Sequence, residues 1–210
     1  MGKVHTKRST CVLGFLCGFH SYSFFASIEG YVIADMSNND WQTKFREAYD
    51  HSLVAWRAGR RSPKTILNAE DATFLASIGC TTQELLDFVE DAQNCGEPDF
   101  GTVLAVQAIR RDYFLTIMSG KLSGRVELMD DLPAKTDAVE EIEWLPRIIT
   151  KARLKLRGEM PADLMYGCGG DRAFLRRMKM SLPDFLKLVW ESGEDGGQII
   201  KVVKRSAGFA

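Results

Sequence analysis

The sequence predicts an all-α protein made of two tandem homologous small helical units packed together. Three observations support this prediction: apolar residues recur every three to four positions, helix-capping residues bound these segments, and the pattern repeats after 100 residues. With 210 residues, of which 45% are hydrophobic and 26% charged, the chain is long enough to bury a core. This composition excludes disordered, collagen-like and disulfide-stapled proteins.

The repeat is clearest where five residues recur 100 positions later. Asp71, Phe74, Leu75, Leu86 and Val89 match Asp171, Phe174, Leu175, Leu186 and Val189. Two copies of one unit explain this most simply. We therefore divide the chain into a first unit at residues 36–120, a connector at 121–138 and a second unit at 139–210, with an N-terminal segment at 1–35. In the connector, Arg125 to Leu128 is a candidate strand.

Four helices are expected in the first unit. Apolar residues recur at helical spacing from Trp41 to Trp56, with Asp40 as a cap before them and Gly59 after them. Asn68 precedes a short second helix, and Thr81-Thr-Gln-Glu84 is a capping-box pattern that begins a third. A fourth helix carries Val103 to Ile117 and ends at Ser119-Gly120.

The second unit repeats this plan. Pro146 suits the first turn of a helix that ends at Gly158, and Asp171 is a candidate cap for the short helix with Phe174 and Leu175. Ser181 and Asp184 repeat the capping pattern with Pro183 inside the first turn. The apolar residues 199–203 fit a helix or a short strand, and the analogy with the first unit favours a helix.

The run from Trp144 to Gly158, followed by Tyr166-Gly-Cys-Gly-Gly-Asp171 and Phe174-Leu175, resembles the bacterial family called domain of unknown function 5069. The resemblance covers residues 140–205, and the first unit looks like a diverged copy. It departs from the pattern at Ser52 to Arg57, which replaces the Leu-Pro-Arg run. The resemblance implies a small, mainly helical bacterial domain without an established role, so it supplies no activity.

The N-terminal segment, residues 1–35, has three interpretations: translated upstream sequence with no fold of its own, a cleaved export signal, and a genuine anchor or core element. An uncharged stretch from Ser9 to Ile28 follows three basic residues, as in a signal peptide, but glycines and His20 interrupt its apolar part and disfavour a membrane anchor. We favour Met36 as the true start, and a cleaved export signal is the alternative. Outside this segment the three cysteines are too widely spaced for a disulfide framework. We therefore expect a cytoplasmic protein with no membrane segment in its mature form.

The loop from Tyr166 to Asp171 is the most unusual local sequence. Its three glycines permit left-handed backbone angles and close approach to a ligand, and it leads into a helix N-terminus, which attracts anions. Asp171 would repel an anion, so a capped structural turn is the favoured interpretation. If a cleft exists here, the ligand-binding candidates are Arg147, Lys151, Tyr166, Cys168, Asp171 and Arg172.

Enzyme chemistry at this loop is the minority interpretation. Cys168 could act as a nucleophile beside Arg172, but the only histidine after Met36 is His51, in the other unit. No pair among His51 and the cysteines has zinc-ligand spacing. The sequence therefore predicts no catalytic residue, no metal site and no cofactor, and leaves open whether the protein is an enzyme.

Charge is divided between the two halves of the chain. Residues 36–140 carry 11 basic and 17 acidic side chains, net −6, and residues 141–210 carry 13 and 9, net +4. Arg147, Lys151 and Lys155 share one helix face, which we interpret as solvated, with attraction between the two units. Nucleic-acid binding is disfavoured because the whole chain is nearly neutral.

These observations favour a noncatalytic binding or adaptor protein. Its partner is unknown, and a protein or an anionic small molecule would each be compatible with the charge distribution. The alternative is a small enzyme or a protein that binds an anionic small ligand in a cleft around the Tyr166 to Asp171 loop. The four tryptophans are interpreted as core or unit-to-unit packing residues rather than a ligand cage.

Overall fold

The computed structural model describes residues 40–208 and confirms the all-α class. This part of the chain forms eight α-helices, one 3-10 turn and a sheet of two short strands. In chain order the elements are α1 (Asp40–Arg57), α2 (Ala69–Ser77), α3 (Thr82–Cys95), α4 (Phe100–Thr116), η1 (Met129–Asp131), β1 (Ala138–Val139), β2 (Ile142–Glu143), α5 (Leu145–Arg157), α6 (Gly169–Arg177), α7 (Leu182–Ser192) and α8 (Gly196–Ala207). The candidate start at Met36 and the whole N-terminal segment lie outside the described residues.

Side-chain caps begin α2 and α3 where the sequence predicted them. The Asn68 side chain accepts the Asp71 backbone N–H at the start of α2. At α3, Thr81 and Glu84 form a complete capping box, in which each side chain accepts the other residue's backbone N–H. Asp40 is itself the first residue of α1 rather than its cap.

The second unit confirms most of its expected helix boundaries. Pro146 lies in the first turn of α5, and Gly158 ends that helix in the left-handed conformation. Ser181 caps α7 by accepting the Asp184 backbone N–H. Residues 199–203 lie within α8, so the helix interpretation of this apolar run is confirmed.

Two local predictions were wrong. Asp171 does not cap α6, because Gly169 and Gly170 are already helical and Cys168 occupies the N-cap position. Of the three loop glycines only Gly167 has a positive φ, at 92°. Arg125 to Leu128 forms no strand, since no neighbouring segment forms a ladder with it; its one backbone bond to another segment runs from the Glu127 N–H to the Glu159 carbonyl.

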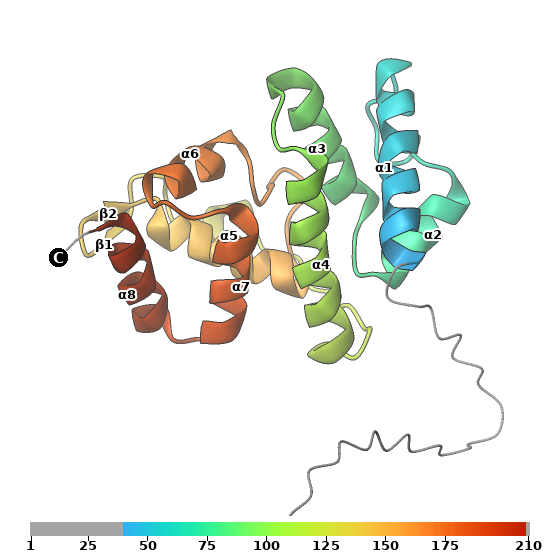
Figure 1. The fold of residues 1–210 in the computed structure, drawn as a ribbon. Coiled ribbons are helices and arrows are strands. Elements are labelled where there is room, and N and C mark those ends of the chain that lie inside the picture. The colour runs from blue at the N-terminus through green and yellow to red at the C-terminus, as the bar shows by residue number, and fades with distance from the viewer. Residues whose placement is uncertain (1–39, 209–210) are drawn as a thin grey trace, which may run out of the picture. The chain divides into compact units, whose positions relative to one another are not determined.

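One hydrophobic core joins helices of both units. It contains Phe45, Val89 and Val106 from the first unit and Ile148 and Phe185 from the second, all nearly inaccessible to solvent. Helix α4 packs against both α5 and α7, and Figure 1 shows it between the helices of the second unit and α1. The two units therefore share their apolar interior, which stabilises them as one body.

The boundaries of the two sets of helices run in parallel. Helices α2 and α6 each have nine residues and begin at positions 69 and 169, while α3 and α7 begin at 82 and 182. Phe74 and Phe174 both contact the shared core, although Phe174 is buried and Phe74 is half-buried. The gene duplication that would explain this order remains a prediction.

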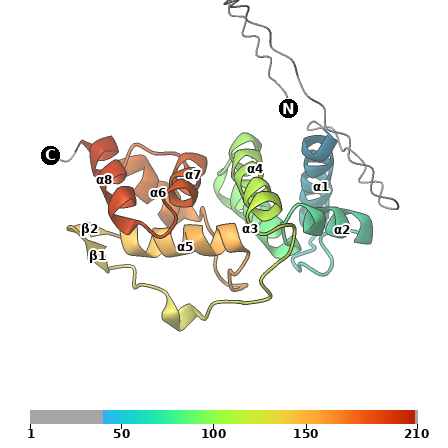
Figure 2. The ribbon, with the colours of Figure 1, turned by 90° about the horizontal axis from the view of Figure 1, so that it is seen from below.

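The connector leaves the end of α4 as an extended chain. Figure 2 shows it passing beside α5 before it reaches the small hairpin, in which β1 and β2 pair antiparallel. Among the described helices, none is both long enough and apolar enough to cross a membrane.

Candidate functional site

Lys151 on α5 and Asp171 on α6 form an ion pair closed off from solvent, with exposed side-chain fractions of 2% and 0%. The Lys151 ammonium donates a hydrogen bond to Asp171 Oδ2. The same oxygen accepts the Gly167 N–H at 2.9 Å, and Oδ1 accepts the Trp144 indole N–H at 3.0 Å. These four groups satisfy one another, as buried charges require. The pair thus joins α5 to the start of α6, and a ligand has no access to it.

Cys168 lies next to this pair, without a histidine partner among the described residues. Its Sγ atom is 3.3 Å from Lys151 Nζ. The histidine named as a possible base, His51, instead has its Nδ1 atom 2.8 Å from Asp71 Oδ2. A Cys–His pair of the kind needed for nucleophilic catalysis does not form between these two residues.

Two other groups with nucleophilic potential are buried and held in their protonated forms. The Tyr166 hydroxyl donates to the Leu182 carbonyl at 2.8 Å, and burial, together with the Asp171 carboxylate, raises its pKa well above the usual value. Burial, with a smaller contribution from Glu84, raises the pKa of Cys80 to about 12. At neutral pH both groups are uncharged and play a packing role.

The basic face of α5 points inward, so the prediction of a solvated face was wrong. Lys155 is as buried as Lys151, and its ammonium lies 2.6 Å from Glu84 Oε1 on α3. Burial opposes ionisation of Glu84, but Lys155 and the hydrogen bonds from Lys155 and Thr81 hold its pKa below the usual value. Spacing of basic residues identifies one helix face, but the neighbouring carboxylates decide whether that face is buried.

Arg110 on α4 is also fully buried, beside this second pair. Burial lowers its pKa, and the Glu84 carboxylate opposes that effect. Its Nε and Nη2 atoms have no hydrogen-bond partner within the described residues. A Cβ atom placed on Gly158 would lie 2.5 Å from Nη2, so the guanidinium abuts the C-terminal end of α5. The negative end of that helix dipole stabilises the charge there.

Ion pairs between the two units all have the same polarity. In the part of the chain that the structure describes, each joins a basic residue of the second unit to an acidic residue of the first. The pairs are Lys155–Glu84, Arg172–Asp91, Arg172–Glu97 and Arg176–Glu97. The expected attraction between oppositely charged units is therefore present in the contacts. Arg147 lies apart from them and donates to the Pro133 carbonyl of the connector at 2.6 Å.

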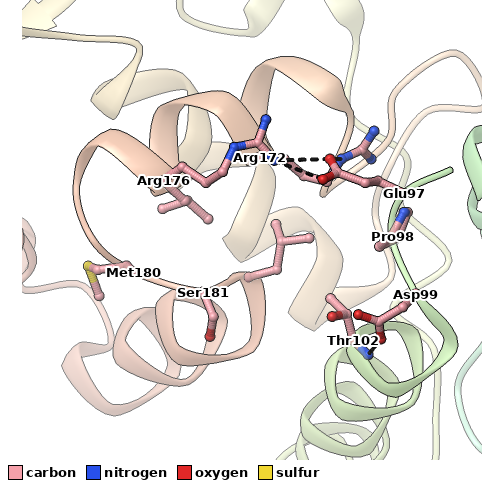
Figure 3. Close-up of a pocket in the computed structure, with 10 residues that line it drawn as sticks. Glu97, Pro98, Asp99, Thr102, Arg172, Arg176, Met180 and Ser181 are labelled. Carbon is pink, nitrogen blue, oxygen red and sulfur yellow. Dashed lines mark hydrogen bonds and ion pairs between the residues drawn. The ribbon is translucent and has the colours of Figure 1, made fainter. Parts of the chain in front are cut away.

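A pocket with a volume of about 200 Å³ lies between α4, α6 and α7. Of the predicted ligand-binding residues, only Arg172 lines it within the described part of the chain. The other lining residues include Glu97, Asp99, Leu175, Arg176 and Leu182. Figure 3 shows Arg172 and Arg176 meeting the Glu97 carboxylate at its edge. Asp99 caps α4 and Ser181 caps α7. Because these charges and helix ends already have partners, the pocket offers apolar contact rather than a free charge.

Exposed apolar side chains gather at the end of α4 and along the connector. Of the seven large hydrophobic side chains exposed in the described residues, six lie between positions 115 and 129. We call these six the connector surface: Leu115, Ile117, Leu122, Val126, Leu128 and Met129. This surface was not predicted, although the even-numbered apolar residues Leu122, Val126 and Leu128 in a segment without helical spacing were a signal for it.

Asp87 on α3 carries a pH-dependent contribution to stability. Burial is the largest influence on its carboxyl group and raises the pKa to about 6. The folded state therefore binds a proton more tightly than the unfolded state, so stability falls as the pH rises from about 4 to about 6. We expect Asp87→Asn to match the original protein near pH 4 and to exceed its unfolding free energy by about 2 kcal/mol at pH 7.

Urea unfolding at pH 4 and pH 7 measures this difference. The amide of the Asp87→Asn variant would keep an oxygen acceptor for Gln83, whose Nε2 lies 2.6 Å from Asp87 Oδ1. The control is Glu47→Gln, which removes an exposed carboxylate on α1, away from Asp87. If Asp87→Asn had the same pH dependence of stability as the original protein, Asp87 would not be the group responsible for it.

No group of three or more metal-ligating side chains converges within residues 40–208. No family model, curated protein sequence or solved structure matches this chain. The resemblance to domain of unknown function 5069 therefore stays a prediction.

Proposed function

We propose that this protein is a noncatalytic adaptor that binds another protein through the connector surface. The observation that carries the proposal is the concentration of exposed apolar side chains between positions 115 and 129, with Val126 and Leu128 exposed at 65% and 67%. Exposing apolar side chains to water is unfavourable, and a partner that covered them would remove this cost.

The state of the reactive groups favours binding over catalysis. Lys151 and Asp171 neutralise each other in the interior, and Cys80 and Tyr166 are buried in protonated form. An enzyme needs a nucleophile or base that a substrate can reach. The alternative function, an enzyme or anion-binding cleft around the Tyr166 to Asp171 loop, is weakened because the side chains meant to hold the ligand bind each other.

The proposal includes a cytoplasmic location. Cys80, Cys95 and Cys168 are free thiols in the structure, and unpaired cysteines are typical of reducing compartments. The charge-complementary contacts between the two units support a stable scaffold from which the connector is presented.

Site-specific photocrosslinking in the native cells tests the proposal. A benzophenone amino acid is placed at position 126 or 128, and at position 54 as a control, because Val54 on α1 is 67% exposed and lies outside the connector surface. We expect both connector positions to crosslink the same protein and position 54 not to do so. The double variant Val126→Asp/Leu128→Asp should then lose binding to that purified protein, while Val54→Asp keeps it.

Circular dichroism and urea unfolding confirm that these surface variants fold. Equal crosslinking from positions 54 and 126 would overturn the proposal. A crosslink to a second copy of this chain would also overturn it, because the surface would then be a homodimer interface.

A further inference from the structure

A second pocket lies where α4, α5 and α7 meet, on the boundary between the two units. Its volume is about 240 Å³, and its lining includes Tyr113, Trp190, Leu156, Arg153, Arg157 and Glu194. The volume is about eight times the ~30 Å³ that one water molecule occupies in the liquid, so a small organic molecule fits. We call it the aromatic pocket.

Aromatic and apolar side chains form one part of this pocket. Tyr113 of the first unit and Trp190 of the second meet edge to face, with ring centroids 5.6 Å apart and planes at 78°. Leu156 and Val189 are almost fully buried beside them. Each ring is half-buried, and the Tyr113 hydroxyl and the Trp190 indole N–H are both hydrogen-bond donors. The rings therefore offer both apolar contact and donors.

Two arginines of α5 form the other part. Arg153 Nη2 donates to the Gly193 carbonyl at 3.1 Å, whereas its Nε is buried and lacks an acceptor among the described residues. Arg157 follows one turn later and pairs with Glu159 at 2.9 Å. The two guanidinium groups thus place positive charge beside the aromatic rings, together with the Arg153 Nε–H donor that has no acceptor among the described residues.

The Glu194 carboxylate already lies near both guanidinium groups, where an anionic ligand would bind, but its contacts with them are long. Its carboxylate lies 3.5 Å from Arg153 Nη2 and 3.9 Å from Arg157 Nη1, and its side chain is 82% exposed. Such long, solvent-exposed ion pairs contribute little stability and exchange easily with other anions. The turn that presents Glu194 contains Gly193 at φ 55°, a left-handed angle that favours glycine.

We propose that the aromatic pocket binds a small aromatic monocarboxylate, whose carboxylate displaces Glu194 from Arg153 and Arg157 and whose ring contacts Tyr113 and Trp190. A carboxylate is favoured because a carboxylate already bridges the two arginines. The ring is favoured because the remaining wall is aromatic and aliphatic. This site is separate from the protein partner proposed above and stands without it, although Ile117 lies at the edge of both.

Titration of the full chain with phenylacetate tests the inference. Binding is followed by the indole N–H resonance of Trp190, which the Trp190→Phe variant assigns. We expect saturable binding with a Kd of about 1 mM or lower, which is reasonable for a ligand of this size. The neutral analogue phenylacetamide, acetate without the ring, and inorganic phosphate should each bind about tenfold more weakly or not at all.

Two variants move the affinity in opposite directions. Arg153→Met should weaken phenylacetate binding about tenfold, and Glu194→Gln should tighten it about threefold because the internal competitor loses its charge. A gain in affinity cannot result from misfolding, so Glu194→Gln keeps the test decisive even if Arg153→Met fails to fold. The control Glu191→Gln, an exposed residue of α7 that pairs with Lys187, should leave the affinity unchanged.

The inference is overturned if phenylacetate shows no saturable binding up to about 10 mM, a limit well above the expected Kd. It is also overturned if phosphate or phenylacetamide binds as tightly as phenylacetate, or if Glu194→Gln leaves the affinity unchanged. Loss of the protein partner in the connector variants would have no bearing on these results, because those variants keep the arginines and Glu194.

Discussion

Replacing Lys151 with methionine is expected to lower the free energy of unfolding by about 3–5 kcal/mol, the range for breaking a buried ion pair. Methionine fills a similar volume but leaves the Asp171 carboxylate, which is 0% exposed, without its positive partner. The hydrogen bonds from Gly167 and Trp144 remain and reduce the loss of stability, but they do not replace the positive charge of Lys151. Urea unfolding at pH 7 measures the effect.

The control is a lysine in an exposed ion pair. Lys44 lies 3.4 Å from Asp40 on α1, and both side chains are 45% exposed. Lys44→Met should change the unfolding free energy by about 0.5 kcal/mol or less. Adding Asp171→Asn to Lys151→Met should recover part of the lost stability, because the uncompensated charge disappears. A loss as small as that of Lys44→Met would show that Asp171 finds another partner or water.

Gly79→Ala is the second substitution with a large expected effect, a loss of about 3 kcal/mol or more. Gly79 follows α2 with φ 70°, where a side chain costs conformational energy, and an added Cβ would lie 2.6 Å from Cγ of the buried Phe114. The ring is held in the core, so the backbone or α4 would have to shift.

Gly96→Ala separates these two causes. Gly96 ends α3 with φ 74°, nearly the same angle, but an added Cβ there would meet nothing within 4 Å. This variant should lose about 1 kcal/mol, from the backbone conformation alone. The difference between the two variants in thermal or urea unfolding reports the clash with Phe114. Equal losses would mean that α4 adjusts to the added methyl group.

Residues close in sequence account for the predictions that the structure confirmed. The capping box of Thr81 and Glu84 and the cap at Asn68 each join groups three positions apart, so their geometry follows from the local chain. Gly158 ends α5 for the same reason. The helix predicted for residues 199–203 by analogy with the first unit is confirmed as well.

The candidate site was predicted in part. Lys151, Cys168 and Asp171 do come together, but as a buried cluster rather than as the wall of a cleft. Arg172 instead bridges to Asp91 and Glu97 in the first unit, 75 or more positions away. Sequence spacing indicated which side chains share a helix face, but it carried no information about the carboxylates that meet that face from other helices.

The sequence by itself determined the helices, most of their ends and the opposite charges of the two units, because these depend on contacts within about one helical turn or on composition. The tertiary structure alone decided that the lysines of α5 point inward, that Tyr113 meets Trp190, and that the connector exposes its apolar side chains. Those outcomes depend on which surfaces meet when the helices pack. Burial is a property of such distant contacts, and the free energy of a charge or an apolar group changes most when it is buried.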